Sequence, residues 1–130
     1  MTSPDLDILI VDGSPLIRRC IRKAADVAGL NSERIYEAAN GQLALELIAQ
    51  QAVDIVFLDL NMPVMDGETF LRSIRSTQEH AKLPVVIVST ESNQECLDRL
   101  KELGIADYLH KPFEPEKLRQ LVVRIMGETL

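Results

Sequence analysis

The chain has 130 residues, of which 46% are hydrophobic and 26% charged, and this composition is typical of a single globular domain over residues 1–130. A formal net charge of −6 argues against a nucleic-acid partner and against an anionic membrane surface. The N-terminus is polar, and no apolar run approaches the ~20 residues that cross a bilayer, so we expect a cytoplasmic protein. Cys20 and Cys96 lack a metal or redox spacing, and we expect both in the core.

Alternating apolar patterns predict five strand–helix units along the chain. Three runs rich in β-branched residues, at 8–11, 55–58 and 85–88, are typical of strands covered on both faces, and weaker strands are expected at 35–38 and 106–109. Apolar residues at helical spacing follow each strand, at 17–28, 43–48, 70–74, 96–103 and 118–125. This order predicts an α/β fold, a doubly wound five-stranded parallel sheet with right-handed crossovers.

Capping signals mark several of the expected helix ends. Ser14 precedes a proline and predicts an N-cap, and Gly29 predicts the end of the same helix. Ser92 and Glu95 have the spacing of a capping box, and Gly104 predicts the end of the helix that they begin.

Chemically active side chains follow four of the expected strands. Asp12, Asp59, Ser89 and Lys111 each lie near the carboxyl end of a strand, where a sheet of this kind binds its ligand. Each residue alone is more often a turn former, a helix cap or a solvated lysine. Four of them at one edge favour a functional site. Its two carboxylates could hold Mg²⁺, or one of them could attack a phosphoryl group, whose oxygen atoms the lysine and the hydroxyl would neutralise and orient.

Longer motifs surround these residues, and they carry a resemblance to a known family. The motifs are VDGS at 11–14 with Arg18 following, DLNMP at 59–63, MDG at 65–67, VSTE at 88–91 and KPF at 111–113. From about residue 8 to residue 126 the chain resembles the receiver domain of two-component response regulators, in the single-domain form typified by the chemotaxis response regulator.

The resemblance implies a strand order of 2-1-3-4-5 with five helices and a phosphorelay function. Asp59 matches the phosphoacceptor, which takes the phosphoryl group from a histidine kinase or phosphotransfer protein. Lys111 would contact the phosphoryl group, with a cis peptide to Pro112, and Ser89 and Tyr108 match the switch hydroxyl and switch aromatic. The face of the fourth helix, fifth strand and fifth helix would then be read by a downstream target protein. Such a protein is a signalling receiver that catalyses only its own phosphorylation and dephosphorylation.

The resemblance also implies a magnesium site and a rate-setting pair. Asp12, Asp59 and the backbone carbonyl of Asn61 would hold Mg²⁺, and the side chains of Asn61 and Glu91 would flank the water that hydrolyses the acyl phosphate. Thr90 is bulkier than the small residue of many receivers and is expected to narrow access to Asp59.

One position departs from the family pattern. Most receivers carry a second acid after the first strand, typically the direct metal ligand, and here that position is Gly13. With Asp12, Asp59 and Lys111 the site totals one negative charge, so we expect weak Mg²⁺ binding. Two hypotheses follow: a working phosphoreceiver with weak metal binding, or a pseudo-receiver that binds its partner without phosphate. A third reading is that Gly13 is an engineered replacement.

Two other classes of protein fit the residues poorly. Haloacid-dehalogenase-like phosphatases need a general acid two residues after the nucleophile, where this chain has Asn61. A flavodoxin-like carrier needs a Ser/Thr-rich phosphate loop after the first strand, where this chain places the carboxylate of Asp12.

Overall fold

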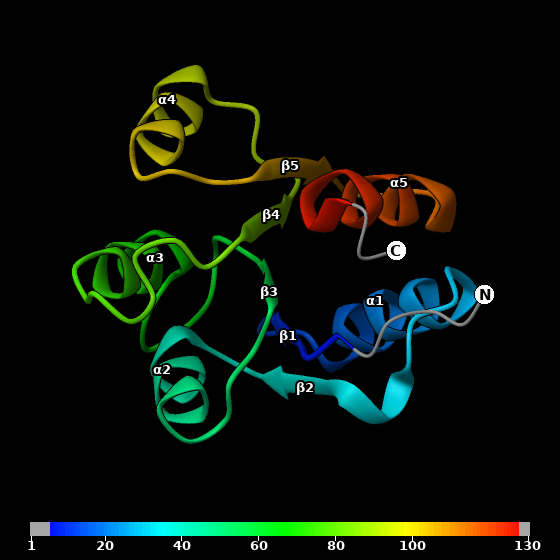
Figure 1. Cartoon of the computed structure of the whole chain (residues 1–130). Helices are drawn as coiled ribbons and strands as arrows, with labels where there is room; N and C mark the ends of the chain where they lie inside the picture. Colours follow the sequence, from blue (N-terminus) through cyan, green and yellow to red (C-terminus); the bar gives the residue numbers. More distant parts are fainter. Residues whose placement is uncertain (1–5, 128–130) are drawn as a thin grey trace.

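Five short strands form one parallel sheet in the computed structural model, which describes residues 6–127. The order is β2-β1-β3-β4-β5, which confirms the expected topology (Figure 1). The strands are β1 (Ile8–Val11), β2 (Ile35–Ala38), β3 (Ile55–Leu58), β4 (Val85–Ser89) and β5 (Asp107–His110). The last strand lies one residue later than expected, because Asp107 begins the pairing with β4.

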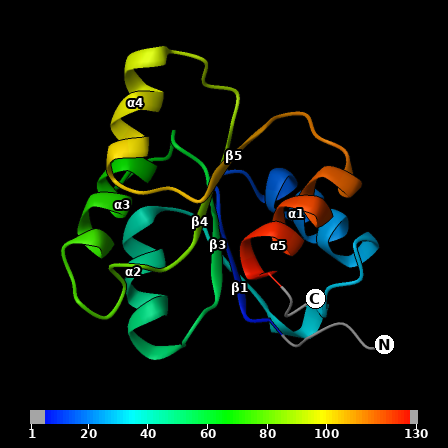
Figure 2. The same ribbon diagram turned by 45° about the horizontal axis from the view of Figure 1, so that its top comes forward.

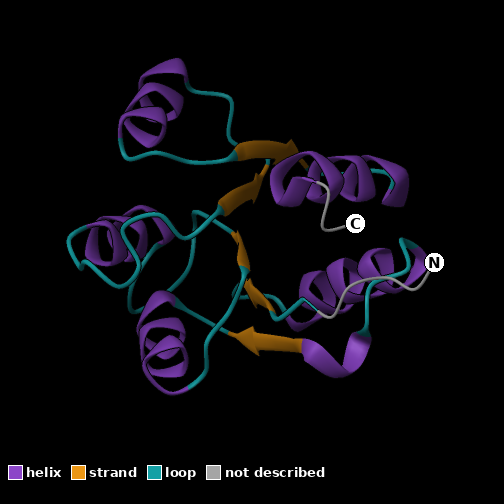
Figure 3. Cartoon of the chain, in the orientation of Figure 1, coloured by secondary structure: helices purple, strands orange, loops and turns teal. Residues whose placement is uncertain are grey.

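Five helices cover the sheet, two on one face and three on the other (Figures 2 and 3). They are α1 (Pro15–Val27), α2 (Gly41–Gln50), α3 (Gly67–Arg75), α4 (Gln94–Glu102) and α5 (Pro115–Met126), and a short 3-10 turn, η1 (Ser32–Arg34), precedes β2. Helices α1 and α5 pack on one face, and α2, α3 and α4 pack on the other. Among residues 6–127, no helix is long and apolar enough to cross a membrane.

The three central strands, β1, β3 and β4, are buried on both sides, because successive side chains point to opposite faces and helices cover each face. In β1, Ile8 and Ile10 join the core beneath α1 and α5, whereas Leu9 and Val11 join the core beneath α2, α3 and α4. All four side chains are fully buried. Burial of each of these side chains stabilises the fold by about 1.5–3 kcal/mol relative to exposure. The two hydrophobic cores therefore fix the position of the sheet and of its strand ends.

Side-chain caps begin four of the helices, and one differs from the expectation. Ser14 caps α1, accepting a hydrogen bond from the backbone N–H of Ile17, as expected. The capping box that Ser92 was expected to begin is wrong, because Asn93 is the N-cap of α4 and accepts from the N–H of Cys96. The cause is local, since the Glu91 carboxylate takes the N–H groups of both Ser92 and Asn93 and delays the helix by one residue.

The expectation that both cysteines lie in the core is wrong for Cys20, which is exposed on α1. Cys96 on α4 is partly buried and packs against the core beneath α2, α3 and α4. On α1 the buried stripe runs through Ile21, Ala24 and Ala25, and Cys20 lies at its edge.

The loop between β3 and α3 contains a strained residue, and this strain yields a stability prediction. Among residues 6–127, Val64 is the only non-glycine residue with positive φ, at 68°, and its side chain is 83% exposed. A β-branched residue is unfavourable in this region, whereas asparagine tolerates it. We expect Val64→Asn to raise the free energy of unfolding by about 1 kcal/mol in urea titrations. Val64→Ile, which keeps the branch, should give no gain, and a loss of stability in Val64→Asn would contradict the interpretation.

Candidate functional site

Two carboxylates meet where β1 and β3 end. Asp12 and Asp59 directly follow these strands, which pair in register with Val11 opposite Leu58. The pairing continues past the strands, because the N–H of Asp59 donates to the Val11 carbonyl at 2.8 Å. Both residues are buried, with 2% of Asp12 and 8% of Asp59 exposed. The expected convergence of the two acids at one edge of the sheet is therefore what the structure contains.

A single ammonium group lies between these carboxylates. The Nζ of Lys111 is 2.9 Å from Oδ2 of Asp12 and 3.4 Å from Oδ1 of Asp59. Lys111 follows β5, its N–H donates to the Ser89 carbonyl at 3.1 Å, and its peptide bond to Pro112 is cis, as the resemblance implied. The three side chains together carry one negative charge.

Burial raises the pKa of Asp59 above its ordinary value. Repulsion from Asp12 raises this pKa further, and the positive charge of Lys111 opposes the increase without cancelling it. A carboxylate of raised basicity that is poorly solvated is a better nucleophile than one in water, and the nearby ammonium group can neutralise an incoming anion.

The β3–α3 loop packs against the backbone of Asp59 at a position, Gly67, where only glycine fits. The N–H of Gly67 donates to the Leu60 carbonyl at 2.9 Å. A Cβ at position 67 would lie 2.1 Å from the Asp59 carbonyl oxygen, closer than atoms can approach. The MDG motif is therefore explained by packing, since only glycine allows α3 to begin this close to Asp59.

Ser89, Glu91 and Tyr108 form one cluster beside the acids. Ser89 is buried, and its Oγ accepts a hydrogen bond from the Glu91 N–H at 3.1 Å. The Tyr108 hydroxyl donates to the Glu91 carbonyl. Burial raises the pKa of Tyr108, and a hydrogen bond with Ser89 opposes this increase. The predicted switch hydroxyl and switch aromatic are thus linked through the backbone of the β4–α4 loop.

Asn61 and Glu91 line a common polar pocket. This pocket of about 380 Å³ lies between the β3–α3 loop and α4, and Arg99 also borders it. The Glu91 carboxylate accepts the N–H groups of Ser92 and Asn93, at 3.1 and 3.0 Å. The structure therefore brings the two expected rate-setting residues to one space, with the Glu91 carboxylate bonded to its own loop.

Gly13 is not required by the backbone or by crowding. Its φ lies outside the left-handed region, and a Cβ there would lie 3.5 Å from Pro63 Cδ, 3.6 Å from the Ala39 carbonyl oxygen and 3.9 Å from Met62 Cγ. These are ordinary van der Waals contacts, so the β-carbon of a side chain fits at this position. The effect of Gly13 is then chemical, namely one fewer carboxylate at the site.

The remaining oxygen atoms suit a hard cation with few protein ligands. Residues 6–127 contain no cluster of three or more His, Cys, Asp or Glu side chains that could hold a metal ion. Asp12 and Asp59 supply two carboxylates, and the described residues place no hydrogen-bond donor on the Asn61 carbonyl. One or two carboxylates with several waters is the usual environment of Mg²⁺, so the donor set fits this ion.

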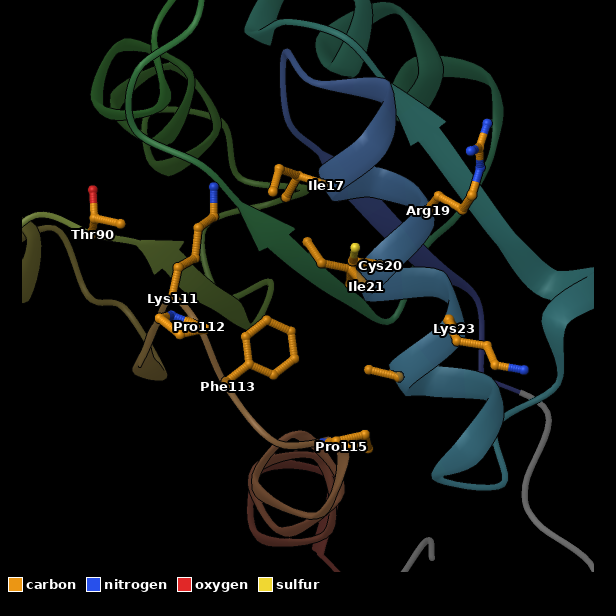
Figure 4. Close-up of a pocket in the computed structure, with 11 residues that line it drawn as sticks. Ile17, Arg19, Cys20, Ile21, Lys23, Thr90, Lys111, Pro112, Phe113 and Pro115 are labelled. Atoms are coloured by element: carbon orange, nitrogen blue, oxygen red, sulfur yellow. The ribbon is translucent and has the colours of Figure 1, made fainter.

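An apolar groove that the sequence did not predict runs from the site along α1 (Figure 4). It has a volume of about 790 Å³ between α1 and the segment 111–115, and Ile17, Cys20 and Phe113 line it. Lys111 and Thr90 border the same groove, and Thr90 is exposed at its edge. The available signals were Phe113 after the KP pair and the position of Cys20 at the edge of the buried stripe of α1.

The sequence comparisons match the chain to one family. Residues 8–123 match the response regulator receiver domain. The chemotaxis protein CheY-3 of Vibrio cholerae is 31% identical over 121 residues, covering 93% of this chain and 92% of that protein. A protein-glutamate methylesterase/protein-glutamine glutaminase of Treponema denticola is 40% identical over 97% of this chain, and the sensor histidine kinase TmoS of Ectopseudomonas mendocina is 32% identical over 95%. The chain spans only 33% and 13% of these two longer relatives.

Solved structures agree with this match. The chemotaxis protein CheY4 of Vibrio cholerae superposes with a TM-score of 0.84 at 30% identity, covering 93% of this chain and 98% of that one. The receiver domain of a sensor histidine kinase from Pseudomonas aeruginosa superposes with a TM-score of 0.83 at 25% identity, covering 95% and 99%. In that receiver domain a magnesium ion is coordinated in the active site cleft.

The raised pKa of Asp59 predicts how stability depends on pH. The folded chain binds a proton at Asp59 more tightly than the unfolded chain, so this group's contribution to stability falls as pH rises from 3.8 through the folded-state pKa. We expect Asp59→Asn to raise the free energy of unfolding at pH 7, and the gain to shrink as pH falls toward 3.8. Urea unfolding across pH, beside the exposed control Asp26→Asn, measures this gain, and a pH-independent gain would contradict the prediction.

Proposed function

The chain belongs to the response regulator receiver domain family of two-component signalling, and from that premise we propose that Asp59 is the residue that becomes phosphorylated. The observation that supports this proposal is the contact of Lys111 with both Asp12 and Asp59 at adjacent strand ends. In the proposed reaction an Asp59 carboxylate oxygen attacks the phosphorus of a phosphohistidine. A P–O bond forms, the P–N bond breaks, and the imidazole leaves as a neutral base after taking up a proton.

The chain's own residues act before and after the transfer. The Lys111 ammonium group shifts from bridging two carboxylates to contacting the phosphoryl oxygens, which carry a larger negative charge. Bound Mg²⁺, held by Asp12, Asp59 and the Asn61 carbonyl, would supply the remaining charge neutralisation. Hydrolysis returns Asp59 to its free carboxylate and releases inorganic phosphate, with the water flanked by Asn61 and Glu91.

The signal passes through the Ser89, Glu91 and Tyr108 cluster. A phosphoryl group on Asp59 attracts the Ser89 hydroxyl, which at present accepts from the Glu91 N–H. Movement of Ser89 would release that N–H and shift the loop whose carbonyl holds Tyr108. We assign the surface of α4, β5 and α5 as the region that a downstream target protein reads, and we place the protein in the cytoplasm as one receiver domain over residues 1–130.

A phosphate-independent pseudo-receiver is the alternative, and Gly13 is the feature that favours it. The retained Asp59, Ser89, Tyr108 and Lys111 favour the phosphoreceiver, because a module that never met phosphate would not need this set together.

Metal and phosphoryl-mimic binding separate the two functions. Mg²⁺ is titrated against the chain with beryllofluoride, which mimics a phosphoryl group, while backbone amide shifts near Asp59 are followed. We expect the wild type to bind the mimic and Asp59→Asn to lose it. Gly13→Asp should bind Mg²⁺ about tenfold more tightly, because it adds a charged oxygen ligand.

The matched control is Gly13→Asn, which has nearly the same shape without the charge and should show little gain. If the wild type gives no response at millimolar Mg²⁺ while Gly13→Asp does, the chain is a pseudo-receiver.

The groove beside the site is assigned to the protein that delivers the phosphohistidine. It is apolar and ends at Lys111 and Thr90, so a surface docked along it lies against the site. Cys20→Trp fills the groove from an exposed position, and we expect it to slow phosphotransfer from a histidine kinase about tenfold through lost apolar contact. Phosphorylation by acetyl phosphate, which needs no docking, should stay unchanged. Val27→Trp is the control on the same helix, and equal slowing with both donors would contradict the assignment.

A further inference from the structure

Arg18 on α1 contacts the backbone of Asp12, one of the two acids of the site. Its Nη1 donates to the Asp12 carbonyl oxygen at 2.6 Å, and its Nε donates to Oε1 of Glu37 on β2 at 2.9 Å. The Arg18 side chain is only 15% exposed. One guanidinium group therefore connects helix α1, the loop after β1 and the edge strand β2.

Glu37 is a firm anchor for this guanidinium group. The Nε of Arg22 donates to its second carboxylate oxygen, Oε2, at 2.9 Å. Burial alone would raise the pKa of Glu37, but hydrogen bonds from Arg22 and Arg18 lower it below its ordinary value. Glu37 therefore stays charged at neutral pH and holds Arg18 by a charge-assisted hydrogen bond.

The backbone that Arg18 holds is the peptide between Asp12 and Gly13. Glycine has the widest backbone freedom, so the orientation of this peptide depends on contacts from outside the loop. The side-chain carboxylate of Asp12 is held as well. Its Oδ1 accepts a hydrogen bond from the Ser14 N–H at 2.9 Å, and its Oδ2 accepts one from Lys111. Arg18 fixes the carbonyl end of Asp12, and Ser14 and Lys111 fix its carboxylate end.

We propose that Arg18, anchored by Glu37, is a positioning residue that fixes the peptide joining Asp12 to Gly13 and so aims the Asp12 carboxylate at a cation shared with Asp59. This inference rests on the proposed function for its metal, but the restraint on Asp12 exists without one. In this chain the restraint acts on Asp12, the one acid that the loop after β1 contains.

Charge and positioning make opposite predictions for the loss of Arg18. Arg18→Met removes a positive charge near Asp12, and by charge alone the site should attract Mg²⁺ more strongly. If Arg18 positions Asp12, Mg²⁺ binding should instead weaken in Arg18→Met, because a mobile Asp12 must be ordered when the ion binds. We expect the Mg²⁺ dissociation constant of Arg18→Met to rise about fivefold, the scale of the net contribution of one typical hydrogen bond. A dissociation constant that falls or stays unchanged would overturn the proposal.

The control variant is Arg119→Met, which makes the same change in net charge and breaks an exposed ion pair with Glu116 on α5. It should leave Mg²⁺ binding unchanged. Arg18→Lys has one donor group where Arg18 has two nitrogens engaged, so it should restore part of the affinity. Glu37→Gln keeps Arg18 but weakens its anchor, and should fall between the wild type and Arg18→Met.

Hydrogen exchange of the Ser14 amide gives a second readout that needs no metal. This amide donates to Asp12 Oδ1 and therefore reports where the Asp12 carboxylate lies. We expect it to exchange about fivefold faster in Arg18→Met, while amides of the buried strand β3 keep their protection. If the wild type binds neither Mg²⁺ nor beryllofluoride, the proposed function fails and this readout still decides the positioning. Unchanged Ser14 exchange would refute it.

Discussion

The repulsion between two buried carboxylates, offset by one ammonium group, is the interaction on which the site depends. Asp12 and Asp59 are forced together by the register of β1 and β3, and Lys111 reaches both from the end of β5. The arrangement leaves one net negative charge and a raised pKa on Asp59. The net negative charge of such a site favours binding of a cation. The Lys111 ammonium group can in turn neutralise a bound anion.

The sheet and the convergence of the four chemical residues were predictable because both follow from strand periodicity. Buried parallel strands have a continuous apolar signal, and parallel order places all their carboxyl ends at one edge. The strand pattern therefore predicts that one edge of the sheet holds four chemically active residues, namely Asp12, Asp59, Ser89 and Lys111. The roles of Tyr108, Asn61 and Glu91 came from the family resemblance, and the structure brings each of them to the same edge.

Features set by side-chain competition were not predictable from the sequence. The start of α4 depends on which N–H groups the Glu91 carboxylate takes, and that choice moved the cap from Ser92 to Asn93. Cys20 is apolar enough for the core but lies at the edge of the buried stripe of α1, in a groove that exists only once the 111–115 segment packs nearby. The contact between Arg18 and the Asp12 carbonyl likewise needs the helix and the loop in three dimensions.

Gly13 removes a carboxylate without a steric or backbone reason, so the function of the chain turns on whether Asp59 still reacts. The most direct measurement is incubation of the chain with acetyl phosphate and Mg²⁺, followed by mapping of any acyl phosphate by mass spectrometry after hydride reduction. We expect a phosphoryl group on Asp59, formed more slowly when Lys111 is replaced by Met. Absence of any adduct on a folded wild-type chain, while Gly13→Asp is modified at Asp59, would contradict it.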